Sequence, residues 1–194
     1  MTKNRLEAFS DGVLAIVITI MVLELKVPHD TTWTSLINIL PVFVSYVFSF
    51  LMIAIYWGNH HHLLHTIHHI NGRILWANTH LLFWLSLVPF GTAYMGENNF
   101  ARNSMILYAV LLNSCGIAYY ILLMSIRAAH HDNLKMLSML KNQRRKGIIS
   151  VVLYTISIGF AFLSPVVAGA IFLLVGISWL IPDRRIEKEA TETI

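Results

Sequence analysis

The chain has 194 residues and a strongly apolar composition, with 56% hydrophobic and 12% charged residues. A soluble domain carries about twice that share of charge, so the composition excludes an ordinary soluble enzyme and indicates an all-α integral membrane protein. The net charge is +4. In a membrane protein the positions of the basic residues first indicate which loops face the cytoplasm, and an acidic partner is considered only after that. No nucleic-acid partner is expected. The one cysteine, Cys115, lies in an apolar run, so neither a disulfide nor redox chemistry is predicted.

The first apolar segment begins with charged residues and is predicted to span the membrane over residues 4–26. Only the twelve residues 12–23 are free of charge, which is short for a span, but the rest of the chain favours a membrane protein. Asp11 then lies inside the span, where an acid costs about 2.5 to 3.5 kcal/mol on insertion scales. Acidic residues within membrane spans are rare, and those that occur usually have a function.

Helical spacing divides this segment into two faces. At 100° per residue, one narrow stripe holds Gly12, Ile16, Ile20 and Leu23, with Thr19 at its border. Asp11 lies nearly opposite the stripe. We therefore expect Ser10 and Asp11 to face neighbouring helices of the same subunit, and the stripe to face something else. Ordinary helix packing is the alternative explanation for the stripe.

Five further apolar runs follow, and we predict a single membrane domain, residues 1–194, with six transmembrane helices. Pro41 is expected to kink the second span, and Ser164-Pro165 joins the last two as a hairpin. The six predicted spans are about 4–26, 35–58, 74–95, 102–126, 147–163 and 166–181.

The segment 127–146 is the most basic connection, with six Lys and Arg residues against Asp132 alone. The positive-inside rule places such a connection in the cytoplasm. With six spans, both termini lie on that side, so the chain is predicted to be a multi-pass protein of the cell membrane with cytoplasmic N- and C-termini. The segment could touch anionic lipid, although a solvated loop is the simpler interpretation.

Histidines cluster between the second and third spans. The run His65-Thr66-Ile67-His68-His69 has the form of one histidine box of membrane di-iron enzymes. Those enzymes need several boxes, so the favoured interpretation is a wet cytoplasmic surface, with His60 or His61 placed to meet Asp11. No catalytic residue, metal site or cofactor is predicted.

The motif Arg5-x-x-x-Phe9-Ser10-Asp11 resembles the signature of the bacterial members of the lysosomal potassium channel family, transmembrane protein 175. The resemblance extends to the run Tyr56-Trp57-Gly58-Asn59-His60-His61, to Asn78 and to Val88-Pro89-Phe90. It covers the first half of the chain well, whereas later spans match mainly in number and length.

This resemblance implies six helices that form a non-canonical cation channel without the Thr-Val-Gly-Tyr-Gly filter, which this sequence lacks. It also implies a homotetramer in which the first helix lines the pore, with Ile16 as the constriction and Thr19, Ile20 and Leu23 as further layers. The motif network implied by the family consists of Arg5, Phe9, Ser10, Asp11, Trp57, His60, His61 and Asn78. Arg5 and this network would hold the pore helix in place.

We therefore predict a weakly selective potassium leak channel with a hydrophobic gate, whose partners are its own copies, potassium ions and the lipid bilayer. It is not expected to be an enzyme. A proton-permeable pore is the first alternative, and a histidine-box metalloenzyme is the second.

Overall fold

The computed structural model describes residues 2–67 and 69–180, and every regular element in them is an α-helix. This confirms the all-α prediction. The helices are α1 (Lys3–Leu23), α2 (Trp33–Asn38), α3 (Leu40–His65), α4 (Gly72–Ser86), α5 (Val88–Glu97), α6 (Arg102–Ala129), α7 (Leu134–Leu163) and α8 (Pro165–Leu180).

Within the described residues, five stretches are long and apolar enough to cross a membrane. They are α1, α3, the α4–α5 pair taken together, α6 and α7. The sixth predicted span, 166–181, corresponds to α8, which is apolar but has 16 residues, whereas a span usually needs about 20. Its predicted last residue, 181, lies outside the described residues.

Two of the predicted spans are each divided into two helices at a proline. The segment 35–58 breaks at Ile39, and Pro41 lies in the first turn of α3. The segment 74–95 breaks at Leu87, and Pro89 lies in the first turn of α5. A proline has no N–H to donate and restricts the residue before it, so it is tolerated at the start of a helix and not within one.

The basic segment 127–146 is mostly helical and not the loop that we expected. α6 continues to Ala129, and α7 begins at Leu134 instead of residue 147. Met136, Leu140 and Gln143 recur every three or four residues and are buried, because one face of this extension packs against α6. Lys135, Lys141, Arg144 and Arg145 are exposed and therefore stand on the outer face of α7.

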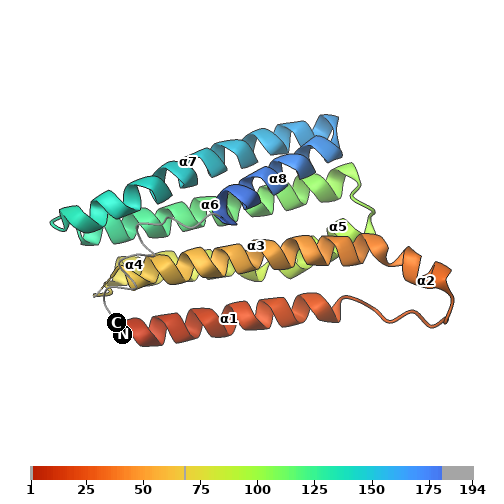
Figure 1. The fold of residues 1–194 in the computed structure, drawn as a ribbon, viewed down its shortest axis with the longest axis horizontal. Helices are drawn as coiled ribbons and strands as arrows, with labels where there is room; N and C mark the ends of the chain where they lie inside the picture. Colours follow the sequence, from red (N-terminus) through yellow and green to blue (C-terminus); the bar gives the residue numbers. More distant parts are fainter. Residues whose placement is uncertain (1, 68, 181–194) are drawn as a thin grey trace.

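The helices form an up-and-down bundle in which α1 lies at one edge (Figure 1). α6, α7 and α8 lie together on the opposite side, with α3, α4 and α5 between them and α1. α1 packs mainly on α3, α4 and α5, so it buries only one face, formed by Leu6, Ser10, Leu14, Val17 and Met21.

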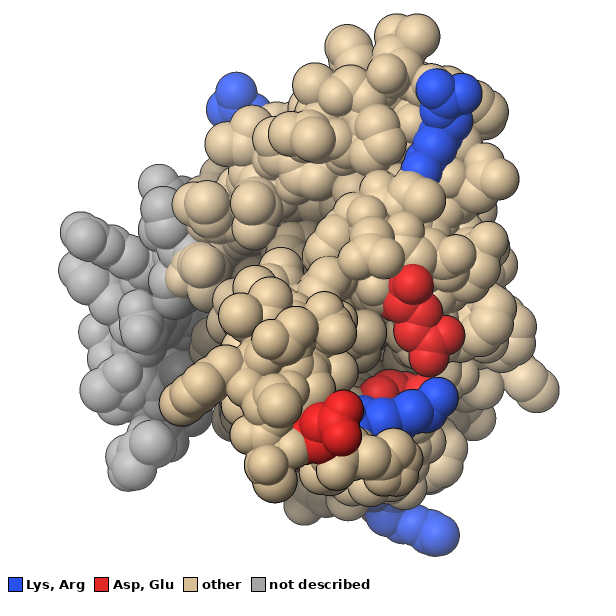
Figure 2. Space-filling view, turned by 90° about the vertical axis from the view of Figure 1, so that its right-hand side faces the viewer, with Lys and Arg blue, Asp and Glu red and all other residues tan. Residues whose placement is uncertain are grey.

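The two ends of the bundle differ in charge. The end at which α1 begins holds Lys3, Arg5, Arg73, Arg127, Lys135, Lys141, Arg144, Arg145 and Lys146. The other end, which Figure 2 faces, carries acidic and basic groups together, among them Lys26 and Glu97, whose charged atoms lie 3.7 Å apart. We refer to the first as the basic end.

Candidate functional site

A buried network of hydrogen bonds joins α1, α3 and α4. The amide nitrogen Nδ2 of Asn78 donates to Ser10 Oγ at 3.0 Å, and Asn78 Oδ1 lies 2.6 Å from His60 Nε2. Ser10 Oγ in turn donates to the Leu6 carbonyl at 2.8 Å. Since Oδ1 can only accept, His60 Nε2 is the donor. One side chain from each helix therefore contributes to the Ser10–Asn78–His60 network, which is almost completely buried.

Asp11 lies beside this network but on the outer surface of the bundle. Trp57 Nε1 donates to Asp11 Oδ1 at 2.9 Å, and the Trp57 ring stacks on His61 with centroids 6.1 Å apart. Trp57 is 47% exposed, and Asp11 is exposed as well. The carboxylate is thus held by a hydrogen bond to α3 while remaining exposed at the surface of the bundle.

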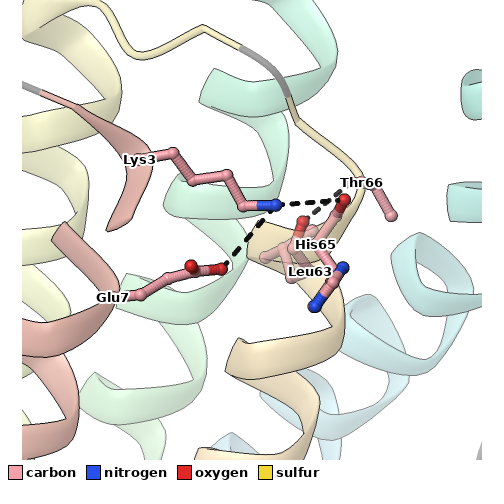
Figure 3. Close-up of polar contacts among 5 residues, drawn as sticks. All are labelled: Lys3, Glu7, Leu63, His65 and Thr66. Atoms are coloured by element: carbon pink, nitrogen blue, oxygen red, sulfur yellow. Dashed lines mark hydrogen bonds and ion pairs between the residues drawn. The ribbon is translucent and has the colours of Figure 1, made fainter. Parts of the chain in front are cut away.

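The beginning of α1 is also tied to the end of α3. Lys3 Nζ lies 3.8 Å from Glu7 Oε1 and 3.4 Å from the backbone oxygen of His65 (Figure 3). A cation near the last carbonyl groups of a helix is favourable, because those groups have no partner within the helix. The sequence did not reveal this contact, since 62 residues separate Lys3 from His65.

The predicted pore stripe points away from the rest of the bundle. Ile16 is 60% exposed, Ile20 42% and Leu23 72%, and Gly12 and Thr19 are exposed as well. The Thr19 hydroxyl donates to the Ala15 carbonyl at 2.8 Å, which leaves the lone pairs of its oxygen available to accept. The chain by itself therefore leaves an apolar strip with one hydroxyl uncovered.

Two members of the predicted motif network lie apart from it. Arg5 is exposed and makes no hydrogen bond or ion pair with the residues that the structure describes, and Phe9 is 54% exposed. The structure brings together Ser10, Asp11, Trp57, His60 and Asn78, and it adds His61 through stacking. It also identifies His60, rather than His61, as the partner of Asn78.

A second buried polar layer was missed by the sequence analysis. Ser49 Oγ lies 2.7 Å from Tyr108 Oη and 2.7 Å from Thr92 Oγ1, and Thr92 Oγ1 lies 3.8 Å from Met21 Sδ on α1. Single hydroxyl groups within apolar runs were the only signal, and nothing in the local pattern indicates that they meet. This layer connects α3, α5 and α6 at the level of Met21.

No metal site is found in the part of the chain that the structure describes. Within residues 2–67 and 69–180, no three His, Cys, Asp or Glu side chains are grouped to hold a metal. A cavity of about 30 Å³ lies between α3, α6, α7 and α8, lined by side chains such as Tyr56, Asn59, Tyr154 and Trp179. It has room for one or two water molecules and lies apart from α1.

These features define an all-helical membrane protein in which one helix is anchored by a polar network and exposes an apolar face. Residues 5–89 match the family model of the endosomal/lysosomal potassium channel TMEM175. A potassium channel of Chryseobacterium sp. (strain P1-3) is 50% identical over 192 residues, which cover 99% of this chain and 100% of that protein. The chain therefore belongs to the TMEM175 family, as a bacterial member.

Two further comparisons agree with this assignment. The crystal structure of a lysosomal potassium-selective channel TMEM175 homolog from Chamaesiphon minutus superposes with a TM-score of 0.80 and 27% identity, covering 92% of this chain and 96% of that one. The endosomal/lysosomal proton channel TMEM175 of Gallus gallus is 29% identical over 132 residues, which cover 62% of this chain and 26% of that protein. The family and these relatives are ion channels, which confirms that the chain is not an enzyme and removes the metalloenzyme alternative.

Replacing Asn78 by Leu should lower the melting temperature of the detergent-solubilised protein, because Ser10 and His60 would lose their shared partner in a buried site. The His60 N–H would then be buried without an acceptor, which costs about 1 to 3 kcal/mol, whereas the Ser10 hydroxyl keeps its bond to the Leu6 carbonyl. The control is Thr79→Ala, which removes an exposed hydroxyl that bonds only to the Leu75 carbonyl of its own helix. Equal melting temperatures for the two variants would show that the network does not hold α1.

Proposed function

We propose that the chain is a potassium-permeable leak channel whose conduction path runs between copies of α1. The observation that carries the proposal is the exposed apolar face of α1, on a helix whose rotation is set by buried hydrogen bonds. In this arrangement Ile16, Thr19, Ile20 and Leu23 line the path.

The exposed carboxylate of Asp11 supports assembly of several copies. Asp11 is eight residues into α1, which corresponds to about 12 Å along the helix axis. A carboxylate at that depth is unfavourable against lipid, whereas a neighbouring subunit or a water-filled path accommodates it. Identical subunits usually close into a symmetric ring, and the motif resemblance implies four copies.

A ring of Ile16 side chains is the proposed gate. Apolar side chains that surround a narrow path exclude water, so an ion meets a barrier until the ring widens. Ile20 and Leu23 would add two further apolar layers toward the end of α1. Arg5, which is exposed at the other end of the helix, would contact a neighbouring copy or the entrance rather than its own subunit.

Thr19 supplies the polar group of the path. Its proton is donated to Ala15, so the free lone pairs of the hydroxyl oxygen can replace part of the hydration shell of a cation. Potassium is preferred over sodium in this scheme because it loses water more easily. One hydroxyl layer is a weak filter, so we expect weak selectivity.

The proposed membrane topology has six crossings, with α8 as the short sixth one. The basic end would face the cytoplasm by the positive-inside rule, which places the start of α1 and the end of α8 there. Lys3, Arg73 and the outer face of α7 would then lie near the cytoplasmic leaflet of the cell membrane.

A proton-permeable pore is the second candidate function. Its support is the similarity to the chicken protein named as a proton channel, together with histidines close to Asp11. His61 stacks on Trp57 and lies 5.0 Å from the His65 ring, so imidazole groups lie near the start of the proposed path.

Reconstituted liposomes distinguish the two functions. The solubilised particle, expected to have the mass of four 22.1 kDa chains, is placed in vesicles loaded with potassium and a pH-sensitive dye. With a protonophore present, potassium efflux should drive proton uptake above that of empty vesicles. With valinomycin in place of the protonophore, uptake above that of empty vesicles would instead favour the proton pore. Uptake equal to that of empty vesicles under both conditions would rule out both functions.

Replacing Ile16 by Asn should raise the potassium flux several-fold and reduce discrimination against sodium, because a polar ring stays hydrated. The control is Ile156→Asn, which introduces the same group at an exposed position of α7, away from α1. Flux unchanged in Ile16→Asn, or raised equally in both variants, would remove Ile16 from the gate.

A further inference from the structure

A groove at the basic end of the bundle lies between α4 and α6. It has a volume of about 390 Å³ and is lined by Arg73, Trp76 and His80 of α4 and by Tyr120, Ile121 and Met124 of α6. Arg73 is the second residue of α4, so the groove begins at the end of the bundle and continues along its flank. A charged group thus stands at one end of the groove and apolar side chains line the rest.

Arg73 has no anionic partner within the described residues. It is exposed and makes no hydrogen bond or ion pair there, and no acidic side chain lines the groove. Arg127, in the last turn of α6, by contrast donates to the Leu137 carbonyl at 3.0 Å. The guanidinium of Arg73 is therefore free to bind an anion from outside the subunit, for which a phosphate has the matching geometry.

His80 supplies a second donor in the groove. Trp84 Nε1 donates to His80 Nε2 at 2.9 Å, so Nε2 is the acceptor and the proton of the neutral imidazole is on Nδ1. Trp76 is 73% exposed, and exposed tryptophans of membrane proteins are typical of the level of the lipid headgroups. Arg73 and Trp76, near the start of α4, thus suit the headgroup region, and Ile121 and Met124 suit a hydrocarbon chain.

We propose that this groove binds an anionic glycerophospholipid, with the phosphate on Arg73 and one acyl chain along Ile121 and Met124. The charge of the site favours this occupant: Arg73 is unpaired among the described residues, and Lys and Arg outnumber Asp and Glu at this end of the bundle. The apolar wall favours a lipid over free phosphate, because a soluble anion would leave it uncovered. The site goes beyond ion conduction and does not depend on the path along α1.

The test is native mass spectrometry of the full-length protein, exchanged in detergent with phosphatidylglycerol or phosphatidylcholine. Wild type should retain phosphatidylglycerol in preference to phosphatidylcholine. A basic residue near anionic lipid contributes roughly five-fold in binding, so Arg73→Gln should reduce retained phosphatidylglycerol by at least about that factor. The matched control, Arg144→Gln, removes the same charge from an exposed position on α7 outside the groove and should retain the lipid.

A second variant tests the acyl-chain part of the groove. Met124→Trp should reduce retention of phosphatidylglycerol while leaving the charge of the groove unchanged. Equal retention of the two lipids by wild type, an equal loss in Arg73→Gln and Arg144→Gln, or full retention in Met124→Trp would each overturn the proposal. A competition experiment distinguishes a lipid from a soluble anion. If millimolar glycerol 1-phosphate displaces phosphatidylglycerol as well as the whole lipid does, the groove is a site for soluble phosphate instead.

A cross-linking experiment tests whether another copy of the chain covers the groove. Disulfide formation between copies of Trp76→Cys in a Cys115→Ser background would show that it does, and this would also contradict a bound lipid.

Discussion

The buried amide of Asn78 sets the rotation of α1, and the rest of the arrangement depends on it. Helices within lipid gain little from hydrophobic burial against one another, so interhelical hydrogen bonds and close packing fix how they face each other. Asn78 accepts from His60 and donates to Ser10, and this satisfies three polar groups at once. Turning α1 about its axis would break these bonds and move Ile16 from its outward position.

With this rotation, the other helices of the chain cover α1 on one side only. Leu14, Val17 and Met21 pack against the bundle, while Ile16 and Leu23 face outward. The exposed apolar side chains alone would be compatible with contact to lipid. The exposed carboxylate of Asp11 on the same helix is not. The proposed assembly of several copies around α1 would accommodate both the exposed apolar side chains and the uncovered carboxylate.

The sequence predicted the helices well and their ends poorly. The apolar runs show where the membrane helices lie, because a segment's insertion into lipid depends on the composition of that segment alone. The start of α7 was missed, because Met136 and Leu140 lie among basic residues and their burial depends on contact with α6. The motif resemblance named most members of the polar network, but only the fold distinguishes His60 from His61 and brings Lys3 to the end of α3. Contacts between distant residues such as Ser49, Thr92 and Tyr108 leave no local pattern.

Thiol modification during flux measurement tests most directly whether α1 lines the conduction path. In a Cys115→Ser background, Leu23→Cys and Leu163→Cys place single thiols at the same end of the bundle, and the native leucines are 72% and 79% exposed. A bulky, charged, water-soluble thiol reagent should react with both variants but should reduce potassium flux only in Leu23→Cys. Unchanged flux through fully labelled Leu23→Cys, or an equal loss in both variants, would contradict a path along α1.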